Sequence, residues 1–549
     1  MPTVSAHVAA TLARHIDHVF GVMGNGNAYF LDALEHQTEA TYTAVRHEAG
    51  GVVAADAHFR ASGRIAAATA TYGAGFTNTL TALAEAVQAH VPLVLVVGDE
   101  PTSGPRPWDV DQIAMASAVG ARTYTVGRSD AAATTVIAIE HALAYRVPTV
   151  LAIPYDVAAL EAGPVPAAPE PVLPAPLRPS PFAAAEIRAL ARTLAGAERP
   201  FLLAGRGAWL AGAGEALGVL AERTGAVTAS TALGRGVFPD ARYDLGVTGG
   251  FGADGAMALV READVAVVFG ASLNQFTMRF GDLFAPGTRV VQVDTAPTAT
   301  HPHVGTFIRG DAAVVASTLV DELDALGAAP SGWREQIDLA ALTTRESGDD
   351  LAADGRLDPR SVARRIGELL PEDRVVVSDG GHFIGWANMY WPVAAPDRMM
   401  MVGTAFQSIG LGFPSVAGAA AAKPDSTVVL TTGDGGGLMA VADLETAVRT
   451  AGGRGMAVVW NDGAYGAEIN LYGLKGLATG PMLIPDVDFA GLASALGAEG
   501  VVVRELADLD RLAAWAARPA AERPFLLLDC RVSPHVIAPY QQEVIRVNS

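Results

Sequence analysis

Two glycine-containing stretches, Gly433-Asp-Gly-Gly-Gly437 and Asn461-Asp-Gly463, decide how this 549-residue sequence is interpreted. Each of them closely follows an apolar run that is typical of a buried strand, and helical periodicity fills the sequence between them. Asn461 lies 27 positions after Asp434. Open α/β sheets bind ligands beyond the carboxyl ends of their strands, so both side chains are predicted to lie at one sheet edge.

The oxygen atoms of these stretches suit a metal-bound diphosphate. Two side-chain oxygens from Asp434 and Asn461, a backbone carbonyl, water and phosphate oxygens match the octahedral oxygen coordination that Mg²⁺ prefers. Gly433, Gly435 and Gly436 let backbone N–H groups approach phosphate oxygens, and the N-terminus of the following helix adds a favourable dipole. A Gly-Asp-Gly sequence alone is equally a tight turn, so the prediction depends on the whole pattern.

The alternation of strands and helices extends over the whole chain and predicts an α/β fold with three doubly wound parallel-sheet domains. The apolar runs expected to form strands are Val91–Val97, Thr149–Ile153, Pro200–Ala204, Ala263–Phe269, Arg289–Asp294, Arg374–Ser378, Ser426–Leu430, Gly455–Trp460 and Pro524–Asp529. The predicted domains cover residues 1–160, 183–345 and 355–549. A proline-rich linker is predicted at 161–182, where we expect neither helix nor central strand, and a polar helical stretch at 325–355.

Composition and charge limit the possible functions. Half of the residues are hydrophobic and 17% are charged, so sizeable cores are expected. The net charge of −20 argues against nucleic acid and anionic membranes as partners, because both require a basic surface. Without a long apolar stretch or a leader sequence, a cytoplasmic protein is expected. The one cysteine, Cys530, lies in an apolar run and is predicted to be a buried structural thiol.

The glycine motifs and their spacing resemble the diphosphate-binding motif of thiamine-diphosphate-dependent enzymes. Further stretches extend the resemblance over almost the whole chain: Arg46-His-Glu-Ala49, Tyr72-Gly-Ala-Gly-Phe-Thr-Asn78, Asp111-Gln112, Asp379-Gly-Gly-His-Phe383 and Thr404-Ala-Phe-Gln-Ser-Ile-Gly-Leu-Gly-Phe-Pro414. The chain is most similar to the acetohydroxyacid (acetolactate) synthase and pyruvate oxidase group. This resemblance implies a pyrimidine-binding domain at 1–160, a central Rossmann-like domain at 183–345 and a diphosphate- and Mg²⁺-binding domain at 355–549.

By this resemblance, Mg²⁺ is coordinated by Asp434, Asn461 and the backbone carbonyl of Gly463. Glu48 is then the catalytic carboxylic acid that hydrogen-bonds N1′ of the aminopyrimidine and promotes the tautomer that removes the C2 proton. An apolar cofactor pocket is expected to raise the pKa of such a carboxyl group. Taken alone, Glu48 would be interpreted as a glutamate at the start of a surface helix.

The resemblance also implies further contacts. The residues expected to line thiamine diphosphate are Gly381, His382 and Phe383 at the diphosphate, Gln407 through its carbonyl at the 4′-amino group, Ile409 as a wedge between the rings, and Tyr465. Gln112 is expected to be a catalytic residue on the substrate side. Asn25, Asn27 and Glu468 are weaker candidates for substrate contacts, and Gly24-Asn-Gly-Asn27 is on its face only a turn.

Two features bear on which reaction and which cofactors within this family the chain could have. No tryptophan occurs from Ala467 to Leu474, where acetohydroxyacid synthases select their second ketoacid, which argues against branched-chain amino-acid synthesis. Gly205-Arg-Gly207 resembles the flavin-binding turn of some relatives, so FAD stays an open cofactor.

The expected function is that of a 2-oxoacid decarboxylase or carboligase resembling acetolactate synthase, which makes or breaks a C–C bond next to a carbonyl. A homodimer or homotetramer with active sites at the subunit interface is implied. A 2-hydroxyacyl lyase with the same cofactor, a catalytically inactive cofactor-binding homologue, and a nucleotide-binding α/β protein that uses Gly-Asp-Gly differently are the alternatives.

Overall fold

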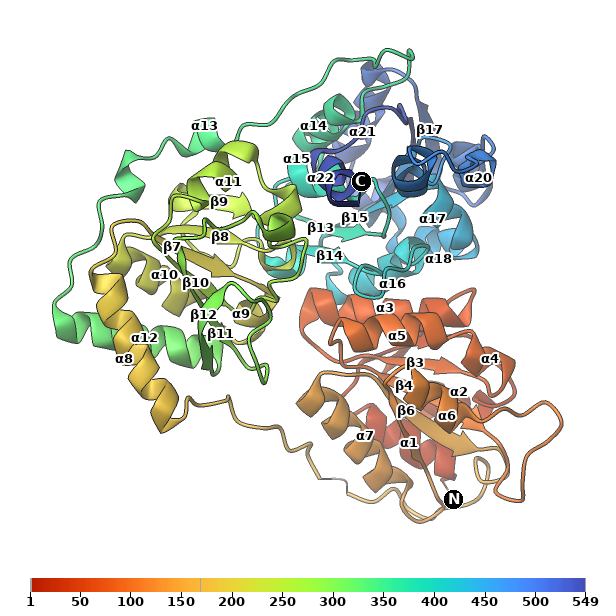
Figure 1. Cartoon of the computed structure of the whole chain (residues 1–549). Helices are drawn as coiled ribbons and strands as arrows, with labels where there is room; N and C mark the ends of the chain where they lie inside the picture. The colour runs from red at the N-terminus through yellow and green to blue at the C-terminus, as the bar shows by residue number, and fades with distance from the viewer. Residues whose placement is uncertain (1, 168, 549) are drawn as a thin grey trace.

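The computed structural model describes residues 2–167 and 169–548, and it contains three α/β domains (Figure 1). Each domain is built around a six-stranded sheet, and every pairing between neighbouring strands is parallel. The predicted α/β fold class with three parallel-sheet domains is confirmed. Position 168 of the predicted linker and positions 1 and 549 at the chain ends lie outside the described residues.

The N-terminal domain (red to orange in Figure 1) has the strand order β2-β1-β3-β4-β6-β5. Its strands are β1 (His18–Gly21), β2 (Thr41–Ala44), β3 (Ala67–Ala70), β4 (Val94–Asp99), β5 (Arg122–Thr125) and β6 (Thr149–Pro154). Its helices are α1 (Val4–Leu12), α2 (Ala28–Gln37), α3 (Glu48–Ser62), α4 (Ala74–Thr77), α5 (Leu80–Gln88), α6 (Gln112–Ala118) and α7 (Ala131–Tyr145).

The central domain (yellow to green) has the strand order β12-β11-β10-β7-β8-β9, which is the doubly wound order of the Rossmann fold. Its strands are β7 (Pro200–Ala204), β8 (Val227–Ser230), β9 (Asp244–Val247), β10 (Val265–Phe269), β11 (Arg289–Asp294) and β12 (Val304–Arg309). Its helices are α8 (Pro181–Ala195), α9 (Arg206–Leu210), α10 (Gly214–Thr224), α11 (Asp254–Val260), α12 (Ala312–Leu326) and α13 (Leu339–Thr343).

The C-terminal domain (cyan to blue) has the strand order β14-β13-β15-β16-β18-β17, which repeats the topology of the N-terminal domain. Its strands are β13 (Arg374–Ser378), β14 (Met399–Met401), β15 (Thr427–Gly433), β16 (Gly455–Asn461), β17 (Glu499–Val503) and β18 (Leu526–Arg531). Its helices are α14 (Pro359–Leu369), α15 (Ile384–Tyr390), α16 (Gly412–Ala422), α17 (Asp434–Met439), α18 (Ala442–Ala451), α19 (Gly466–Glu468), α20 (Phe489–Ala495), α21 (Asp510–Ala516) and α22 (Pro539–Asn548).

Two local expectations need correction. The segment expected to stay non-helical ends inside a helix, because α8 begins at Pro181 with Ser180 as its N-cap. Proline is tolerated there because its missing N–H would have no partner in the first helical turn. The stretch 327–355 is also not an extended helical region, since it contains only the short helix α13 and a 3₁₀ turn at Arg334–Gln336.

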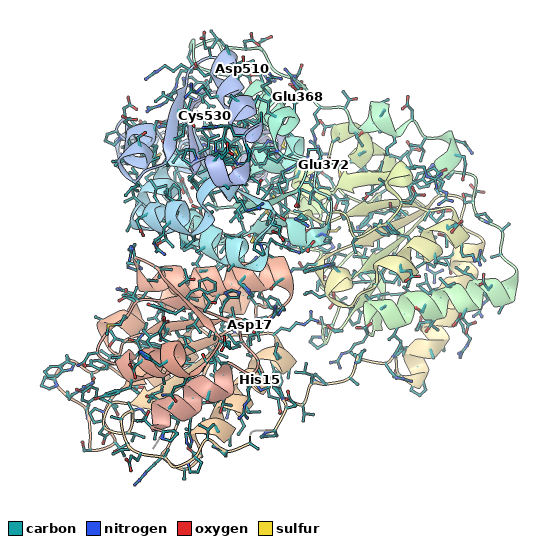
Figure 2. The ribbon with its side chains drawn as sticks, turned by 180° about the vertical axis from the view of Figure 1, so that it is seen from behind. His15, Asp17, Glu368, Glu372, Asp510 and Cys530 are labelled. Carbon is teal, nitrogen blue, oxygen red and sulfur yellow. The ribbon has the colours of Figure 1, made fainter. Side chains whose placement is uncertain are left out.

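The apolar runs predicted as strands form the central strands of the three sheets, where they are buried along most of their length. Every residue of β4, β15, β16 and β18 is buried, as expected for parallel strands covered by helices on both faces. Cys530 in β18 is fully buried inside the C-terminal domain, as predicted (Figure 2). Within the described residues, no helix has the length and apolar character needed to cross a membrane.

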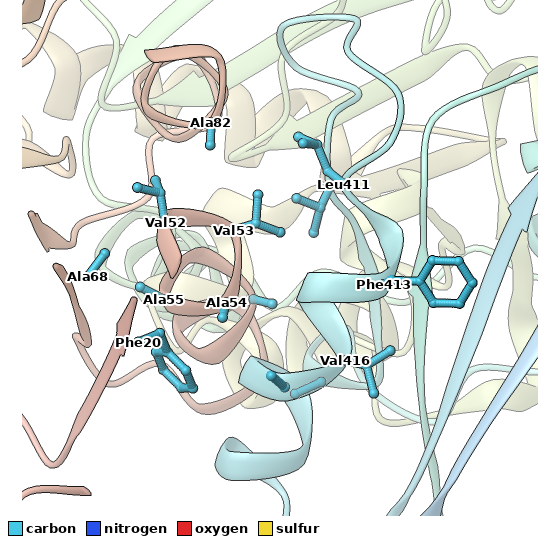
Figure 3. Close-up of a cluster of buried hydrophobic side chains, with 14 of the residues drawn as sticks. Phe20, Val52, Val53, Ala54, Ala55, Ala68, Ala82, Leu411, Phe413 and Val416 are labelled. Carbon is cyan, nitrogen blue, oxygen red and sulfur yellow. The ribbon is translucent and has the colours of Figure 1, made fainter. Parts of the chain in front are cut away.

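The N-terminal and C-terminal domains pack against each other through α3 and α16 (Figure 3). Val53 and Val416 belong to the same buried cluster between the two helices. A Cβ atom added at Gly418 would lie 1.9 Å from the carbonyl oxygen of Ala54, so a glycine is required for this close approach. The position of α3 matters for function because its first residue is Glu48.

Candidate active site

The candidate site lies where the strand order of the C-terminal sheet reverses. The chain runs outward from β13 to β14 and then returns to β15 on the other side of β13. Ligands of doubly wound sheets bind at the carboxyl ends of the strands beside such a reversal. Asp379 follows β13, Asp434 follows β15, and Asn461 ends the neighbouring strand β16. The structure thus brings the two sequence motifs together at one sheet edge.

Asp434 is buried at this edge. One oxygen of its carboxylate accepts the N–H of Gly463 at 2.8 Å, and the other accepts the N–H of Gly435 at 2.9 Å. Burial, followed by the negative charge of Asp462, raises the pKa of Asp434 to about 6. A divalent cation would offset both effects, because it compensates the lost hydration and the repulsion between the two carboxylates.

The side chain of Asn461 is oriented by a buried carboxylate. Its amide nitrogen donates to Oδ1 of Asp529 at 2.9 Å. Because a carboxylate only accepts hydrogen bonds, this contact identifies the nitrogen and leaves the amide oxygen as the atom able to bind a cation. Arg356 adds support from outside the motif by donating to the backbone carbonyls of Asn461 at 2.8 Å and Asp462 at 3.2 Å.

Gly463 connects the two motifs through its backbone. Its φ of +78° is in the left-handed region, and its N–H is the donor to Asp434. Its carbonyl oxygen accepts the N–H of Ile484 at 2.8 Å. A carbonyl oxygen has two lone pairs, so one remains for the predicted metal contact.

The glycines after β15 form a cradle that other side chains approach closely. A Cβ atom added at Gly433 would lie 2.9 Å from the ring of Phe383, and one at Gly435 would lie 2.6 Å from the ring of Tyr465. Larger residues at these positions would displace both rings from the sheet edge. The structure therefore places the predicted residues Phe383 and Tyr465 on either side of the Gly-Asp-Gly turn.

Asp379 ties three segments of the site together. Its fully buried carboxylate accepts N–H groups from Gly380 at 2.8 Å, Leu411 at 3.1 Å and Gly410 at 3.2 Å. It also accepts the hydroxyl of Thr432 at 3.0 Å. A Cβ atom on Gly436 would lie 2.7 Å from this carboxylate. Burial raises the pKa of Asp379 to about 6, although the backbone N–H of Leu411 and the Thr432 hydroxyl oppose the shift.

His382 is paired with a carboxylate. Its Nε2 lies 2.6 Å from Asp462, and the Tyr540 hydroxyl donates to its backbone carbonyl. Burial lowers the pKa of His382, but the charge and hydrogen bond of Asp462, together with the charges of Asp434 and Glu468, raise it overall. Since Nε2 faces Asp462, the ring has Nδ1 left for the predicted diphosphate contact. Gly381 before it is exposed, with a φ of +138°.

The segment 403–410 carries an unusual backbone conformation. Gln407 is exposed and has a φ of +58°, and the N–H of Ser408 donates to the Gly403 carbonyl at 2.8 Å. A left-handed residue other than glycine costs about 1–3 kcal/mol and is often found at functional sites. Ile409 is half-buried, and a Cβ atom on Gly380 would lie 3.2 Å from it. The segment therefore lies against the loop that follows β13.

Glu48 lies at the carboxyl edge of the N-terminal sheet. It is half-buried at the start of α3, and one of its carboxylate oxygens accepts the side-chain N–H of Asn78 at 2.9 Å. A Cβ atom on Gly75 would lie 3.5 Å from its other oxygen. The structure thus brings Glu48 next to the Tyr72–Asn78 turn. Within the described residues, no hydrogen bond or ion pair joins Glu48 to the C-terminal domain.

Gln112 is buried inside the N-terminal domain. Its side-chain oxygen accepts the N–H of Gly73 at 2.8 Å, and its nitrogen donates to the Gly98 carbonyl at 2.9 Å and to Asp99 at 3.1 Å. These contacts position the Tyr72–Asn78 turn from behind. Its role on the substrate side stays a prediction.

The weaker substrate candidates differ in their surroundings. Asn27 is buried and stabilises the turn before α2, since it donates to the Val22 carbonyl and Thr69 and accepts the N–H of Gly24. Asn25 is exposed and donates to the Tyr72 hydroxyl at 2.9 Å. Glu468 is exposed at the end of α19. Asn25 and Glu468 have the accessibility that a substrate contact requires, whereas the side chain of Asn27 is committed to the turn.

The Gly205-Arg-Gly207 turn does not present phosphate-binding groups. The N–H of Gly205 donates to the Phe269 carbonyl at 2.9 Å, and that of Gly207 donates to the Gly270 carbonyl at 2.8 Å. Cβ atoms at either glycine would lie within 2.8 Å of the Gly270 oxygen. The glycines therefore allow close packing between two loops, and this arrangement does not favour a flavin phosphate at this turn.

The residues around Asp434 fit a Mg²⁺ diphosphate. Asp434 supplies a buried carboxylate next to a second one, Asn461 directs its oxygen away from Asp529, and the glycine cradle brings backbone N–H groups to the sheet edge. No group of three or more His, Cys, Asp or Glu side chains in the described part of the chain is arranged to bind a metal. The predicted ligand set has a different composition, because it combines a single carboxylate with an amide oxygen and a backbone carbonyl.

Several residues of this site were not singled out from the sequence. Asp379 belongs to a quoted motif but showed no sign of its contacts with Gly410 and Thr432. Arg356 and Asp529 orient Asn461 from 105 and 68 positions away along the chain. Asp462 could have been found from the sequence, because it directly follows Asn461 and therefore lies at the same sheet edge.

Three sequence profiles match the chain in the order of its domains. They are the N-terminal TPP-binding domain of thiamine pyrophosphate enzymes at residues 2–115, their central domain at 187–319 and their C-terminal TPP-binding domain at 379–530. The chain belongs to the thiamine pyrophosphate enzyme family. The chain therefore contains both TPP-binding domains of this family and its central domain.

Known relatives of the chain align with most of its length. An acetolactate synthase of Mycobacterium avium is 28% identical, over 95% of this chain and 87% of its own. A sulfoacetaldehyde acetyltransferase of Alcaligenes xylosoxydans xylosoxydans is 28% identical, over 93% of this chain and 89% of its own. The solved structure of a thiamine diphosphate-dependent 4-hydroxybenzoylformate decarboxylase from Rhodococcus jostii RHA1 has the same fold, with a TM-score of 0.78, 21% identity, and coverage of 97% of this chain and 99% of its own.

We predict that Asp434→Ala abolishes tight binding of thiamine diphosphate. The diphosphate would lose its bridging cation, and its own negative charge would be left without compensation. Isothermal titration calorimetry with thiamine diphosphate and Mg²⁺ measures the effect directly. Asp425→Asn is the matched control, because this exposed aspartate precedes the opposite end of β15 and should leave the affinity unchanged. An Asp434→Ala protein that binds the cofactor like the wild type would remove the proposed metal site.

Proposed function

We propose that this enzyme binds thiamine diphosphate with Mg²⁺ and acts as a 2-oxoacid decarboxylase or carboligase resembling acetolactate synthase. The observation that carries the proposal is that each of two domains with the same strand order holds one set of the predicted functional residues. Glu48 lies beside the Tyr72–Asn78 turn in one domain, and Asp434 with Asn461 lies at the strand reversal of the other. Acetolactate synthases among the relatives that align over most of the chain support this activity.

In this proposal, Asp434, Asn461 and the carbonyl of Gly463 would hold Mg²⁺, and the cation would neutralise the charge of the diphosphate. Asn461 is already oriented before the metal binds, because its side-chain amide donates to Asp529 and its backbone carbonyl accepts a hydrogen bond from Arg356. Such outer contacts support affinity, because a ligand that is already oriented loses little conformational freedom on binding. The proposal does not include FAD, because the N–H groups of Gly205 and Gly207 donate to backbone carbonyls.

When bound, the thiazolium ring supplies the nucleophilic carbon that adds to a substrate carbonyl. Glu48 is proposed to exchange a proton with N1′ of the aminopyrimidine, and Asn78 orients the Glu48 carboxylate for this contact. Gln407 is exposed and has a left-handed backbone, and its carbonyl is proposed to accept a hydrogen bond from the 4′-amino group. Ile409 is proposed to keep the two rings of the cofactor bent toward each other.

The proposed assembly is a homodimer, or a homotetramer built from dimers, with each active site shared between two subunits. Glu48 contacts residues of its own domain, and Asp434 does the same in the C-terminal domain. Large apolar side chains are exposed near both predicted halves of the site, namely Met23, Tyr29 and Trp108 in one domain and Phe406, Met439 and Leu474 in the other. In the proposed dimer, a partner subunit would cover these side chains.

The substrate is proposed to be a small 2-oxoacid or a related carbonyl compound. The stretch Ala467–Leu474, which contains no tryptophan, forms the end of α19 and a π-helical turn at Ile469–Gly473. Tyr472 and Leu474 are exposed there. This exposed segment is where a second substrate would be selected, and its composition does not favour the branched-chain pathway.

The activity is tested by mass spectrometry of products from a panel of 2-oxoacids, each supplied with and without an aldehyde acceptor. We expect loss of CO₂ from at least one 2-oxoacid and a new C–C bond when an acceptor is present. A protein that processes no 2-oxoacid but cleaves a 2-hydroxyacyl compound would instead be a lyase with the same cofactor.

We predict that Glu48→Gln slows proton exchange at C2 of bound thiamine diphosphate by about 10²–10⁴-fold, the usual contribution of a general acid–base group. Glutamine keeps the size and one hydrogen bond but cannot transfer the proton, so cofactor affinity should change far less. Hydrogen–deuterium exchange at C2, followed by NMR after acid quenching, measures this step without knowledge of the substrate. Exchange at the wild-type rate would show that Glu48 is not the activating acid.

We also predict that mixing inactive Glu48→Ala and Asp434→Ala subunits restores part of the activity. Each hybrid dimer would contain one site with both functional residues intact, because the two residues of a site come from different chains. The measurement is turnover after co-expression or subunit exchange, with each variant alone as the control. Activity that stays absent in verified hybrid dimers, or a fully active monomer, would contradict a shared site.

A further inference from the structure

A buried cluster of charged side chains links the N-terminal domain to the segment that carries Gln407. The Glu85 cluster consists of Asp56 and Arg60 on α3 and Glu85 on α5, whose exposed fractions are 1%, 5% and 1%. Arg60 donates from Nε and Nη2 to the carboxylate of Asp56, and from Nη2 to Glu85 at 3.2 Å. Buried charges of this kind are tolerated only when they are paired and hydrogen-bonded.

The Glu85 cluster bonds directly to the backbone of the C-terminal domain. One carboxylate oxygen of Glu85 accepts the N–H of Phe406 at 2.7 Å, and the other lies 3.4 Å from the N–H of Ala405. Arg60 donates from Nη1 to the carbonyl of Met401 at 2.8 Å. The cluster therefore contacts both ends of the short stretch from Met401 to Phe406.

The negative charge that Glu85 brings is balanced by cations from two domains. Arg60 neutralises one carboxylate of the pair formed by Asp56 and Glu85. Arg206 of the central domain lies near them and donates to the carbonyl of Ala89, the residue that caps the C-terminus of α5. All three domains thus meet at this cluster, and removal of the Glu85 charge would leave a surplus of buried positive charge.

The contacts of Glu85 end one residue before the unusual backbone. Gln407 directly follows Phe406 and has a φ of +58°, a conformation that a free chain seldom adopts. Two residues later, Ile409 lies beside Gly380 of the loop after β13. A left-handed residue is maintained only when its neighbours are held on both sides. Glu85 supplies this restraint on the N-terminal side, and Asp379 supplies it on the C-terminal side through Gly410 and Leu411.

We propose that Glu85, together with Arg60, is a positioning residue that holds the 403–409 segment in its left-handed conformation and sets its register against α3. Helix α3 carries both Arg60 and Glu48, so the same cluster relates the proposed acid of this domain to the segment that presents the Gln407 carbonyl. Neither residue touches the proposed cofactor. The effect on catalysis rests on the proposed function, whereas the restraint on the segment does not.

The first experiment measures the segment itself. Amide hydrogen–deuterium exchange of a peptide covering residues 401–411, followed by mass spectrometry, is compared between the wild type and Glu85→Gln. Loss of a charge-assisted hydrogen bond should speed exchange of these amides by about tenfold or more. Glu445→Gln is the matched control, because Glu445 also crosses the interface between the same two domains, through Arg46, but does not contact the segment.

The second experiment measures the consequence for the cofactor in the holoenzyme. With saturating thiamine diphosphate and Mg²⁺, we expect exchange at C2 to fall about tenfold or more in Glu85→Gln, since small misplacements of aligned groups are costly. Glu85→Asp keeps the charge but shortens the reach, so it should also loosen the segment. This second variant decides the proposal if Glu85→Gln does not fold.

The outcomes separate the two claims. Unchanged exchange of the 401–411 amides in a folded Glu85 variant overturns the proposal. Faster amide exchange with wild-type exchange at C2 confirms that Glu85 holds the segment but overturns its positioning role in catalysis, because Glu85 would then contribute only to local stability. A wild-type enzyme that does not accelerate C2 exchange over the free cofactor removes the proposed function, and the amide measurement then still decides whether Glu85 holds the segment.

Discussion

The buried carboxylate of Asp379 is the interaction on which the candidate site depends. It accepts hydrogen bonds from the loop after β13, from the segment before α16 and from the end of β15. A single group thus fixes three stretches that are separated by tens of residues in the sequence. Because an unsatisfied buried carboxylate is costly, these segments are held together for as long as the domain is folded. The glycines around Asp434 are close enough to form a cradle only in this arrangement.

The second constraint is the contact between α3 and α16. The N-terminal and C-terminal sheets share one strand order, and the two domains meet through these equivalent helical layers (Figure 3). Apolar side chains of the two helices form a shared buried cluster, and Gly418 allows the close approach to Ala54. The Glu85 cluster fixes the relative orientation of the two domains, because Arg60 donates to the Met401 carbonyl and Glu85 accepts the N–H of Phe406. Burial alone would leave the two domains free to slide along each other.

Groups that are unfavourable for folding gather around the candidate site. Asp434 lies next to Asp462 with a raised pKa, and Gln407 has a left-handed backbone. Natural sequences break local rules mainly where function requires it, and a bound ligand can offset the cost. A metal would compensate the charges at Asp434, and a hydrogen bond to the Gln407 carbonyl would use the exposed backbone. Because buried carboxylates are costly, those of Asp379 and Asp434 accept hydrogen bonds from several backbone N–H groups.

Sequence alone determined the α/β class and the long central strands, because buried parallel strands such as β15 and β18 must be apolar along their whole length. It also placed Asp434 and Asn461 together, since both follow neighbouring strands at the same edge. Short outer strands such as β2 and β14 have no comparable signal, because four or three residues show too little periodicity. Only the tertiary structure decided that Gln112 faces inward, that His382 pairs with Asp462 and that Glu85 binds the backbone at Phe406. Those contacts join residues far apart in the chain, and a hydrogen bond between distant segments leaves no pattern in the local sequence of either one.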